Sequence, residues 1–256
     1  MSNPTKPTII IIPGSFCALS QYESVINQLK SHGYPVEGVE LETIGPRDNA
    51  PTLYDDAASV AALATRLADE GKDVVLVPHS YGGLVACEAS KGLAKSVREK
   101  EGKNGGISRI VFVTSVIGRI GESLKDIMAG ENDLNYIRVE GEYMFMDPAS
   151  CAPVVFSDLP LDQGIFWSAQ MPCHSAISFA QKLTYAAYKD IPTSYLQVCE
   201  RDKCISPRLQ NKIIAALDSQ SDLKVERHSV QADHAIHITQ PKAVVDVVRK
   251  AIGDVE

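Results

Sequence analysis

Three polar residues that lie far apart in the chain have the types that nucleophilic catalysis by a serine requires. Ser80 occurs in the segment Pro-His-Ser-Tyr-Gly, Asp202 in Cys-Glu-Arg-Asp-Lys and His234 in Gln-Ala-Asp-His-Ala. A serine hydroxyl is a weak nucleophile at neutral pH and needs a base within hydrogen-bonding reach. The base in turn needs a carboxylate that fixes its tautomer and stabilises its charged form. We therefore predict that His234 accepts the proton of Ser80 and that Asp202 orients His234.

Two other acids compete for the role of Asp202. Glu200 lies two residues before Asp202, and Asp233 is the immediate neighbour of His234. Because Asp233 adjoins the histidine in sequence, we expect its side chain to point elsewhere. Asp202 is the preferred acid, and Glu200 and Asp233 stay open as alternatives.

Ser80 lies where an aliphatic run passes into a helical pattern. This position predicts a tight turn between a strand and a helix. A serine on a turn of this kind is held with its hydroxyl above the sheet, and small residues flank the turn because its backbone is strained and closely packed. The usual pattern is Gly-x-Ser-x-Gly, and here Pro78 replaces the first glycine. Taken alone, the segment would also fit a serine that merely caps the following helix.

The same chemistry needs two backbone N–H groups that stabilise a developing oxyanion. One is expected from Tyr81, which follows the nucleophile at a helix N-terminus. The other is expected from Ser15, in the loop Pro-Gly-Ser-Phe after the first apolar run. Ser15 could instead cap the helix that follows this loop.

A repeating order of aliphatic run, turn and helical pattern surrounds these residues. The runs are continuous rather than alternating, which is typical of strands buried on both faces of a parallel sheet. Amphipathic 3-4 spacing follows the runs and indicates helices. The order Ser, Asp, His along the chain is the one expected on such a sheet. The expected strands are 8–12, 36–41, 73–77, 109–114, 193–198 and 223–228, and the expected helices are 20–32, 53–70, 83 to about 98, 206–217 and one from about 241.

The alternation stops near Gly121 and resumes at Thr193. The segment between, about residues 122–190, contains nine of the sixteen aromatic residues and four of the five methionines. Ordinary packing accounts for most of these side chains. The functional alternative is a lid over a pocket, where aromatic and Met side chains supply adaptable apolar contacts. We predict one domain, 1–256, with 122–190 as a cap inserted into it.

Composition and charge limit the classes of protein. With 45% hydrophobic and 22% charged residues among 256, the chain is globular rather than disordered. A net charge of −7 disfavours nucleic acid as a partner. No apolar run approaches the roughly 18 residues that span a membrane, and the N-terminal run is too short for a signal peptide. The six cysteines form neither a disulfide framework nor a zinc-ligand spacing. We expect a cytoplasmic monomer or homodimer that uses no metal and no cofactor.

Six segments together carry a family resemblance. They are residues 12–15, 52–56, 75–83, 156–158, 195–202 and 232–234. With them the sequence resembles the α/β-hydrolase superfamily, and in particular its branch of small esterases, plant methyl esterases and hydroxynitrile lyases. The resemblance implies an eight-stranded, mostly parallel sheet flanked by helices, a helical cap and a Ser-His-Asp triad. It covers nearly the whole chain, with the cap only loosely matched.

The sequence departs from this family at four positions. Pro13 stands where the family usually has His, and Pro78 replaces the first glycine of the turn. Hydroxynitrile lyases of the branch typically carry Thr at the position of Gly14 and Lys at the position of Ala235. The resemblance therefore implies hydrolysis of an ester, thioester or lactone rather than cyanide chemistry.

We predict a serine hydrolase that cleaves a small apolar carboxylic ester or lactone through an acyl-enzyme. Phe16, Trp167 and His174 are the candidate substrate contacts, whereas His79 is expected to point into the fold and His237 has no assigned role. The first alternative is a lyase, cyclase or acyltransferase of secondary metabolism on the same fold. The second is a ligand sensor with slow turnover. Fold resemblance alone does not decide among them.

Overall fold

A six-stranded parallel sheet forms the centre of the computed structural model, which describes residues 6–131, 135–198 and 201–255. The strand order is β2-β1-β3-β4-β8-β9, and every neighbouring pair is parallel. Each expected strand overlaps one of these strands, although β2 ends three residues earlier and β9 begins three residues later than expected. The strands are β1 (Thr8–Ile12), β2 (Val36–Gly38), β3 (Asp73–Pro78), β4 (Gly106–Val113), β8 (Thr193–Val198) and β9 (Glu226–Val230).

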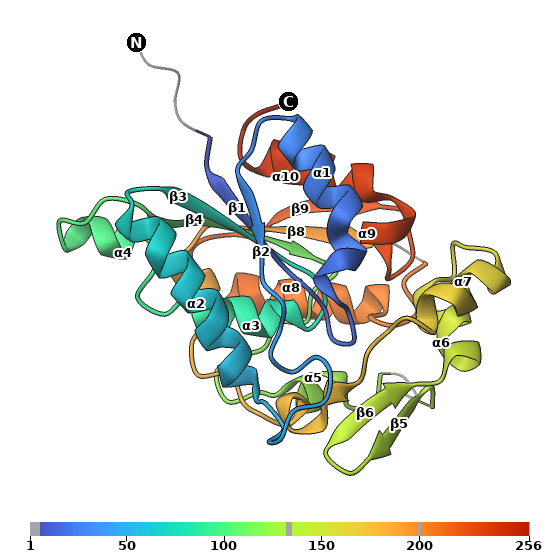
Figure 1. The fold of residues 1–256 in the computed structure, drawn as a ribbon. Coiled ribbons are helices and arrows are strands. Elements are labelled where there is room, and N and C mark those ends of the chain that lie inside the picture. The colour runs from blue at the N-terminus through green and yellow to red at the C-terminus, as the bar shows by residue number, and fades with distance from the viewer. Residues whose placement is uncertain (1–5, 132–134, 199–200, 256) are drawn as a thin grey trace.

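The continuous aliphatic runs are explained by helices on both faces of the sheet (Figure 1). Successive side chains of a strand point to opposite faces. Ile9 and Ile11 therefore join one buried cluster with α1 and α10, while Ile10 and Ile12 join another with α2, α3 and α8. These helices are α1 (Glu23–Ser31), α2 (Leu53–Asp69), α3 (Gly82–Ala89), α8 (Pro207–Gln220) and α10 (Pro241–Ala251).

The segment between β4 and β8 has mixed secondary structure rather than the helical cap that the resemblance implied. It contains a separate three-stranded antiparallel sheet, β5-β6-β7. A two-residue turn joins β5 to β6, and Gly141 in this turn has a φ of +59°, which glycine adopts without strain. The elements are α5 (Leu124–Met128), β5 (Ile137–Glu140), β6 (Tyr143–Met146), α6 (Pro148–Val155), α7 (Leu161–Ser168), β7 (His174–Ser175) and the 3-10 helices η2 (Ala176–Phe179) and η3 (Ala187–Lys189).

Two further expectations differ from the structure. The central sheet has six strands in the described residues instead of eight. The single helix expected from 83 to about 98 is two helices, because Gly92 adopts a φ of +75° between them. The remaining elements are α4 (Lys95–Lys100), η1 (Leu19–Tyr22) and α9 (Ile236–Thr239).

Candidate active site

Ser80 occupies the sharp turn between β3 and α3. Its φ is +52°, a left-handed conformation that costs a non-glycine residue about 1–3 kcal/mol. Three backbone hydrogen bonds hold the turn: His79 N–H donates to the Ile12 carbonyl at 3.0 Å, Ser80 N–H to Val113 at 3.2 Å, and Val116 N–H to Ser80 at 2.9 Å. Strands β1 and β4 thus keep the serine in this strained position.

The residues that flank Ser80 show why small side chains follow it. A Cβ on Gly82 would lie 2.6 Å from the Pro13 carbonyl oxygen, and one on Gly83 would lie 2.5 Å from that of Val116. Pro78, which replaces the usual first glycine, continues the β3 ladder opposite Ile12. Its carbonyl accepts a hydrogen bond from Ser115 Oγ at 2.9 Å. The turn therefore forms with proline at this position.

The structure brings Ser80, His234 and Asp202 together although they come from three separate loops. Ser80 Oγ lies 3.0 Å from His234 Nε2, and His234 Nδ1 lies 2.9 Å from Asp202 Oδ2. With its Nδ1–H donated to the carboxylate, a neutral His234 has its Nε2 lone pair directed at the serine hydroxyl. All three side chains are buried, with 2–7% of the residue surface exposed.

The Asp202 carboxylate is held by several donors besides His234. Oδ1 accepts the N–H groups of Cys204 at 2.8 Å and Ile205 at 2.7 Å. Oδ2 accepts Thr114 Oγ1 at 2.5 Å and Gln210 Nε2 at 3.3 Å. These donors fix the carboxylate and stabilise its charged form, as a buried charge requires.

The pKa of His234 lies well above its ordinary value of 6.5. Burial by itself lowers this pKa, but the charge of Asp202 and the hydrogen bond to it outweigh burial and stabilise the imidazolium. The Cys204 side chain also contributes to the upward shift. His234 is thus a stronger base than an isolated imidazole.

The two rival acids have different positions. Asp233 is buried, and its oxygens accept Asp158 N–H at 3.0 Å and Thr239 Oγ1 at 2.8 Å. These bonds direct its carboxylate away from the His234 ring. Glu200 lies outside the described residues.

The two predicted oxyanion donors belong to different segments next to Ser80. Tyr81 follows Ser80 directly at the start of α3. Ser15 and the adjacent Phe16 line the same small cavity as Ser80. The loop that carries Ser15 is itself unusual, since Phe16 has a φ of +59°. The loop that carries Ser15 thus lines the same cavity as Ser80, the residue that precedes Tyr81.

A chain of buried hydrogen bonds lies beneath Ser80 and joins three loops. Gly14 N–H donates to Tyr22 Oη at 3.0 Å, Tyr22 Oη lies 2.8 Å from His79 Nδ1, and His79 Nε2 lies 3.0 Å from the His234 carbonyl. Since that carbonyl can only accept, His79 must carry its proton on Nε2, and Tyr22 must donate to Nδ1. Burial, with the charges of His237 and His234, lowers the pKa of His79 well below 6.5 and keeps it neutral. His79 therefore lies in the fold, as expected, and His237 stacks on Tyr22 with ring centroids 4.1 Å apart.

A second buried network holds the Tyr81 side chain. Tyr81 Oη and Thr43 Oγ1 each donate to Asp56 Oδ2 at 2.8 Å, and Thr43 N–H donates to Oδ1 at 3.0 Å. Burial raises the pKa of Asp56 to about 6, against the lowering effect of these hydrogen bonds. This network ties α2 to the residue that follows the nucleophile.

The cavity at Ser80 is small and mostly apolar. Its volume is about 40 Å³, far below the several hundred Å³ of typical ligand pockets. Tyr136 and Cys204 are its polar lining residues in addition to the two serines. The lining residues are Ser15, Phe16, Ser80, Val116, Leu124, Met128, Tyr136, Ile137, Met146, Phe179, Cys204 and Ile205.

Of the three predicted substrate contacts, the structure places only Phe16 at this cavity. His174 is completely buried behind it, with its ring 5.3 Å from that of Phe16 and 5.0 Å from that of Tyr81. Its Nε2 bonds Ser178 Oγ at 3.0 Å, and burial lowers its pKa to about 3. Trp167 on α7 packs against a separate apolar cluster that includes Phe156 and Ala235. His174 and Trp167 therefore serve as packing residues of the cap.

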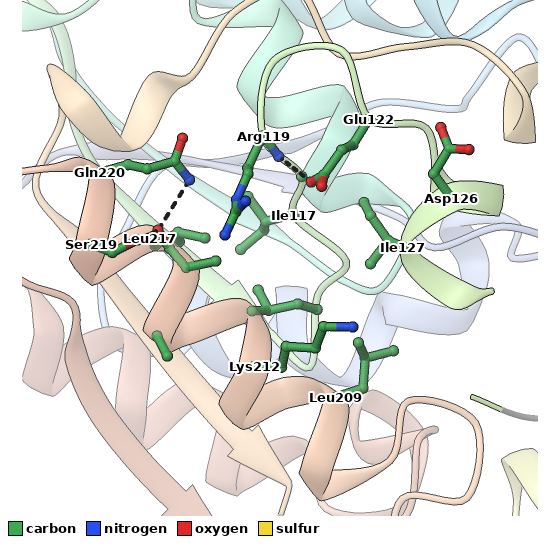
Figure 2. A pocket seen from close by; sticks show the side chains of 14 residues that line it. Ile117, Arg119, Glu122, Asp126, Ile127, Leu209, Lys212, Leu217, Ser219 and Gln220 are labelled. Atoms are coloured by element: carbon green, nitrogen blue, oxygen red, sulfur yellow. Dashed lines mark hydrogen bonds between the residues drawn. The ribbon is translucent and has the colours of Figure 1, made fainter. Parts of the chain in front are cut away.

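A larger cavity of about 410 Å³ lies between the β4–α5 loop and α8 (Figure 2). It contains none of the three triad candidates. Arg119 and Lys212 flank an apolar floor that includes Ile117 and Leu217. We therefore do not choose it as the candidate active site despite its size, because Ser80 and His234 lie elsewhere. In the described residues, no cluster of His, Cys, Asp and Glu has the arrangement of a metal site, and no helix is long and apolar enough to cross a membrane.

Sequence reasoning missed four residues that support the site: Tyr22, Asp56, Thr114 and Gln210. Thr114 is the last residue of a predicted strand, and Asp56 belongs to a segment that carried the family resemblance. The predicted strand and the family resemblance thus pointed to the segments that contain Thr114 and Asp56, but not to these two residues themselves. Nothing in the local sequence of Tyr22 or Gln210 indicates their partners.

Comparison with known proteins identifies the family of this chain. The model of the alpha/beta hydrolase family matches residues 9–247. Probable hydrolase R7 of Phoma sp. is 32% identical over 252 residues, covering 97% of this chain and 99% of that protein. Alpha/beta hydrolase nvfD of Aspergillus novofumigatus is 25% identical, covering 97% and 98%. The protein therefore belongs to the alpha/beta hydrolase family.

Solved structures agree on the fold at low sequence identity. A pyrethroid hydrolase from Sphingobium faniae superimposes with a TM-score of 0.75 at 17% identity, covering 97% of this chain and 98% of that one. Polyneuridine aldehyde esterase gives 0.72 at 18% identity, covering 96% and 99%.

Proposed function

We propose that the protein is a serine hydrolase that cleaves a small, uncharged, apolar carboxylic ester or lactone. The observation that carries this proposal is the continuous alignment of Ser80 Oγ, His234 and Asp202, with contacts of 3.0 and 2.9 Å. It occurs at a strained strand-to-helix turn, as nucleophilic serines of this fold require. The relationship to a probable hydrolase at 32% identity supports the same class of reaction.

In the proposed reaction His234 Nε2 accepts the Ser80 proton while Oγ attacks the carbonyl carbon. The N–H groups of Ser15 and Tyr81 stabilise the oxyanion of the tetrahedral intermediate. The His234 imidazolium then protonates the leaving alkoxide oxygen, and an acyl-Ser80 ester is left. Water, deprotonated by His234, attacks this ester and releases the carboxylic acid. Asp202 orients His234 throughout.

The lining of the cavity supports an apolar substrate of modest size. Leu124, Met128, Ile137 and Met146, all from the segment between β4 and β8, face Ser80. A space of about 40 Å³ cannot hold an ester, so we infer that this segment moves away from Ser80 when substrate enters. The cap predicted at 122–190 would then act as a lid.

A fluorophosphonate probe tests the nucleophile directly. It should label the intact protein at Ser80, and Ser80→Ala should abolish both labelling and turnover of p-nitrophenyl butyrate. Ser90→Ala is the matched control, because Ser90 is a buried serine that follows the last residue of α3 and donates to the Ala86 carbonyl, and it does not line the cavity. Absence of labelling in the folded wild type, or labelling at another residue, would refute the mechanism.

A further inference from the structure

The cavity at Ser80 contains a polar feature that the proposed reaction does not use. Among the described residues that line it, Ser15 and Ser80 belong to the reactive centre, and Tyr136 and Cys204 supply the other polar groups. The remaining lining residues are aliphatic, Met or Phe. A hydroxyl group in such a space has a strong effect on which substrates bind, because an unpaired buried donor is costly.

The Tyr136 hydroxyl has only a weak partner. Tyr136 is 4% exposed, and its Oη lies 3.6 Å from Cys204 Sγ; no other hydrogen bond of this hydroxyl is found in the described part of the chain. Thiol sulfur is a weak hydrogen-bonding group. Burial raises the pKa of Tyr136 above its ordinary value of 10.0, so the phenol keeps its proton and can donate it at any working pH. An oxygen atom would be a better acceptor than the sulfur.

The backbone fixes Tyr136 in this place. Its carbonyl accepts Asp147 N–H at 2.8 Å, which links it to the residue that caps α6. The hairpin β5-β6 begins at the next residue, Ile137. Tyr136 is therefore carried by a hydrogen-bonded element rather than by a free loop.

The partner of Tyr136 lies beside the base. Cys204 lines the cavity together with Ser80, and Cys204 N–H donates to the Asp202 carboxylate that bonds His234. His234 Nε2 must deliver its proton to the leaving oxygen of the substrate. Tyr136 and Cys204 line the cavity next to the Asp202–His234 pair, so we place the alcohol half of an ester against these two residues.

We propose that Tyr136 is a specificity-determining residue whose hydroxyl donates a hydrogen bond to a second oxygen in the alcohol half of the substrate. The substrate class is then an ester or lactone with an ether, carbonyl or hydroxyl oxygen a few bonds beyond the leaving oxygen. On binding, this oxygen replaces Cys204 Sγ as the hydrogen-bond partner of the Tyr136 hydroxyl. The inference rests on the proposed hydrolytic function of Ser80.

Two pairs of esters test the proposed role of Tyr136. The two members of each pair differ only in whether one position is an ether oxygen or a CH₂ group. The first pair is 2-methoxyethyl butanoate and n-butyl butanoate, in which an ether oxygen replaces a CH₂ group of the alcohol. The second pair, propyl 3-methoxypropanoate and propyl pentanoate, places the same replacement in the acyl half. For each pair the ratio of kcat/KM values is measured in wild type, Tyr136→Phe and Tyr143→Phe. Tyr143 is a matched control in the same hairpin, with its hydroxyl bound to Arg47 N–H at 2.8 Å.

The alcohol-side ratio should fall about 3- to 10-fold in Tyr136→Phe, the effect of one lost hydrogen bond. The acyl-side ratio should stay the same, and Tyr143→Phe should change neither. Comparing ratios between variants cancels the different intrinsic reactivities of the esters. An unchanged alcohol-side ratio, or a change confined to the acyl-side pair, overturns the inference and leaves the hydrolase intact. Failure of folded wild type to hydrolyse any of the four esters overturns the proposed function and this inference with it.

Discussion

Asp202 is the residue on which the proposed chemistry of His234 depends most. Two backbone N–H groups, a threonine hydroxyl and a glutamine amide hold its carboxylate. Its second role is electrostatic, because its negative charge raises the pKa of His234 despite burial. A base with a raised pKa must lose its proton at a higher pH before it can accept one from serine.

The raised pKa of His234 determines how the rate of ester hydrolysis should depend on pH. Protonated His234 cannot act as a base, so kcat/KM for p-nitrophenyl butyrate should rise with pH, and the midpoint should lie above 6.5. Asp202→Asn should lower this midpoint and reduce kcat by roughly 10³- to 10⁴-fold, through loss of charge and of the correct tautomer. The measurement is a rate profile between pH 5 and 9.

Asp233→Asn is the matched control for this prediction. Asp233 adjoins His234 in sequence, but its carboxylate bonds Asp158 and Thr239. Its substitution should leave kcat within a few-fold of wild type. A larger loss in Asp233→Asn than in Asp202→Asn would show that the acid has been assigned to the wrong residue.

Buried side chains of Tyr22 and His79 connect the loops that form the candidate site. Tyr22, the last residue of η1, bonds the loop that carries Ser15 and also His79, which in turn bonds the carbonyl of His234. The loop that carries Ser15, the turn at Ser80 and the loop that carries His234 are thereby joined by buried hydrogen bonds. Misplacement by a fraction of an ångström is expensive in catalysis.

Tyr22→Phe should therefore impair turnover more than binding. Gly14 N–H loses its acceptor and His79 Nδ1 loses its donor, so we expect a loss of about 1–3 kcal/mol in the free energy of unfolding. We also expect kcat to fall on the order of 10-fold with little change in KM. Urea unfolding and steady-state kinetics measure the two effects.

Tyr188→Phe separates positioning from simple loss of stability. Tyr188 is equally buried, but its hydroxyl bonds Gly118 at 3.4 Å, away from Ser80. This variant should lose stability without loss of kcat. Equal kcat for Tyr22→Phe and wild type would show that the hydrogen-bond chain only supports the fold.

On the scale of the whole molecule, charge and cavity lining point to the same kind of substrate. The chain carries a net charge of −7, and the cavity at Ser80 offers no cationic side chain among its described lining residues. A carboxylate on the substrate would be buried without a partner, which costs several kcal/mol.

Ethyl butanoate and monoethyl succinate test whether the cavity disfavours a charged substrate, because they differ mainly in a terminal carboxylate. We expect kcat/KM for the charged ester to be lower by about 100-fold or more at pH 7. Added NaCl should not restore it, since screening acts on exposed charges rather than in a closed cavity. Comparable rates for the two esters would contradict an apolar binding site.

The α/β architecture could be predicted from the sequence because its signals are local. The strands β1 and β3 are aliphatic runs, and alternate residues such as Ile9 and Ile10 pack against helices on opposite faces. The strand count of eight was wrong, as it came from resemblance rather than from runs in this chain. The helix expected across Gly92 was also wrong, because composition favoured helix and one glycine conformation ended it.

The sequence by itself determined which residues could react and on which edge of the sheet they would lie. Ser80, Asp202 and His234 each follow a strand, and the carboxyl ends of parallel strands share one edge. Their catalytic roles stay a prediction until the experiments above are done. Only the tertiary structure decided which acid faces His234, which cap residues reach Ser80, and how Tyr22, Thr114 and Asp56 support the site. These contacts join segments dozens of residues apart, and the direction of a buried side chain depends on packing across the core rather than on its neighbours in sequence.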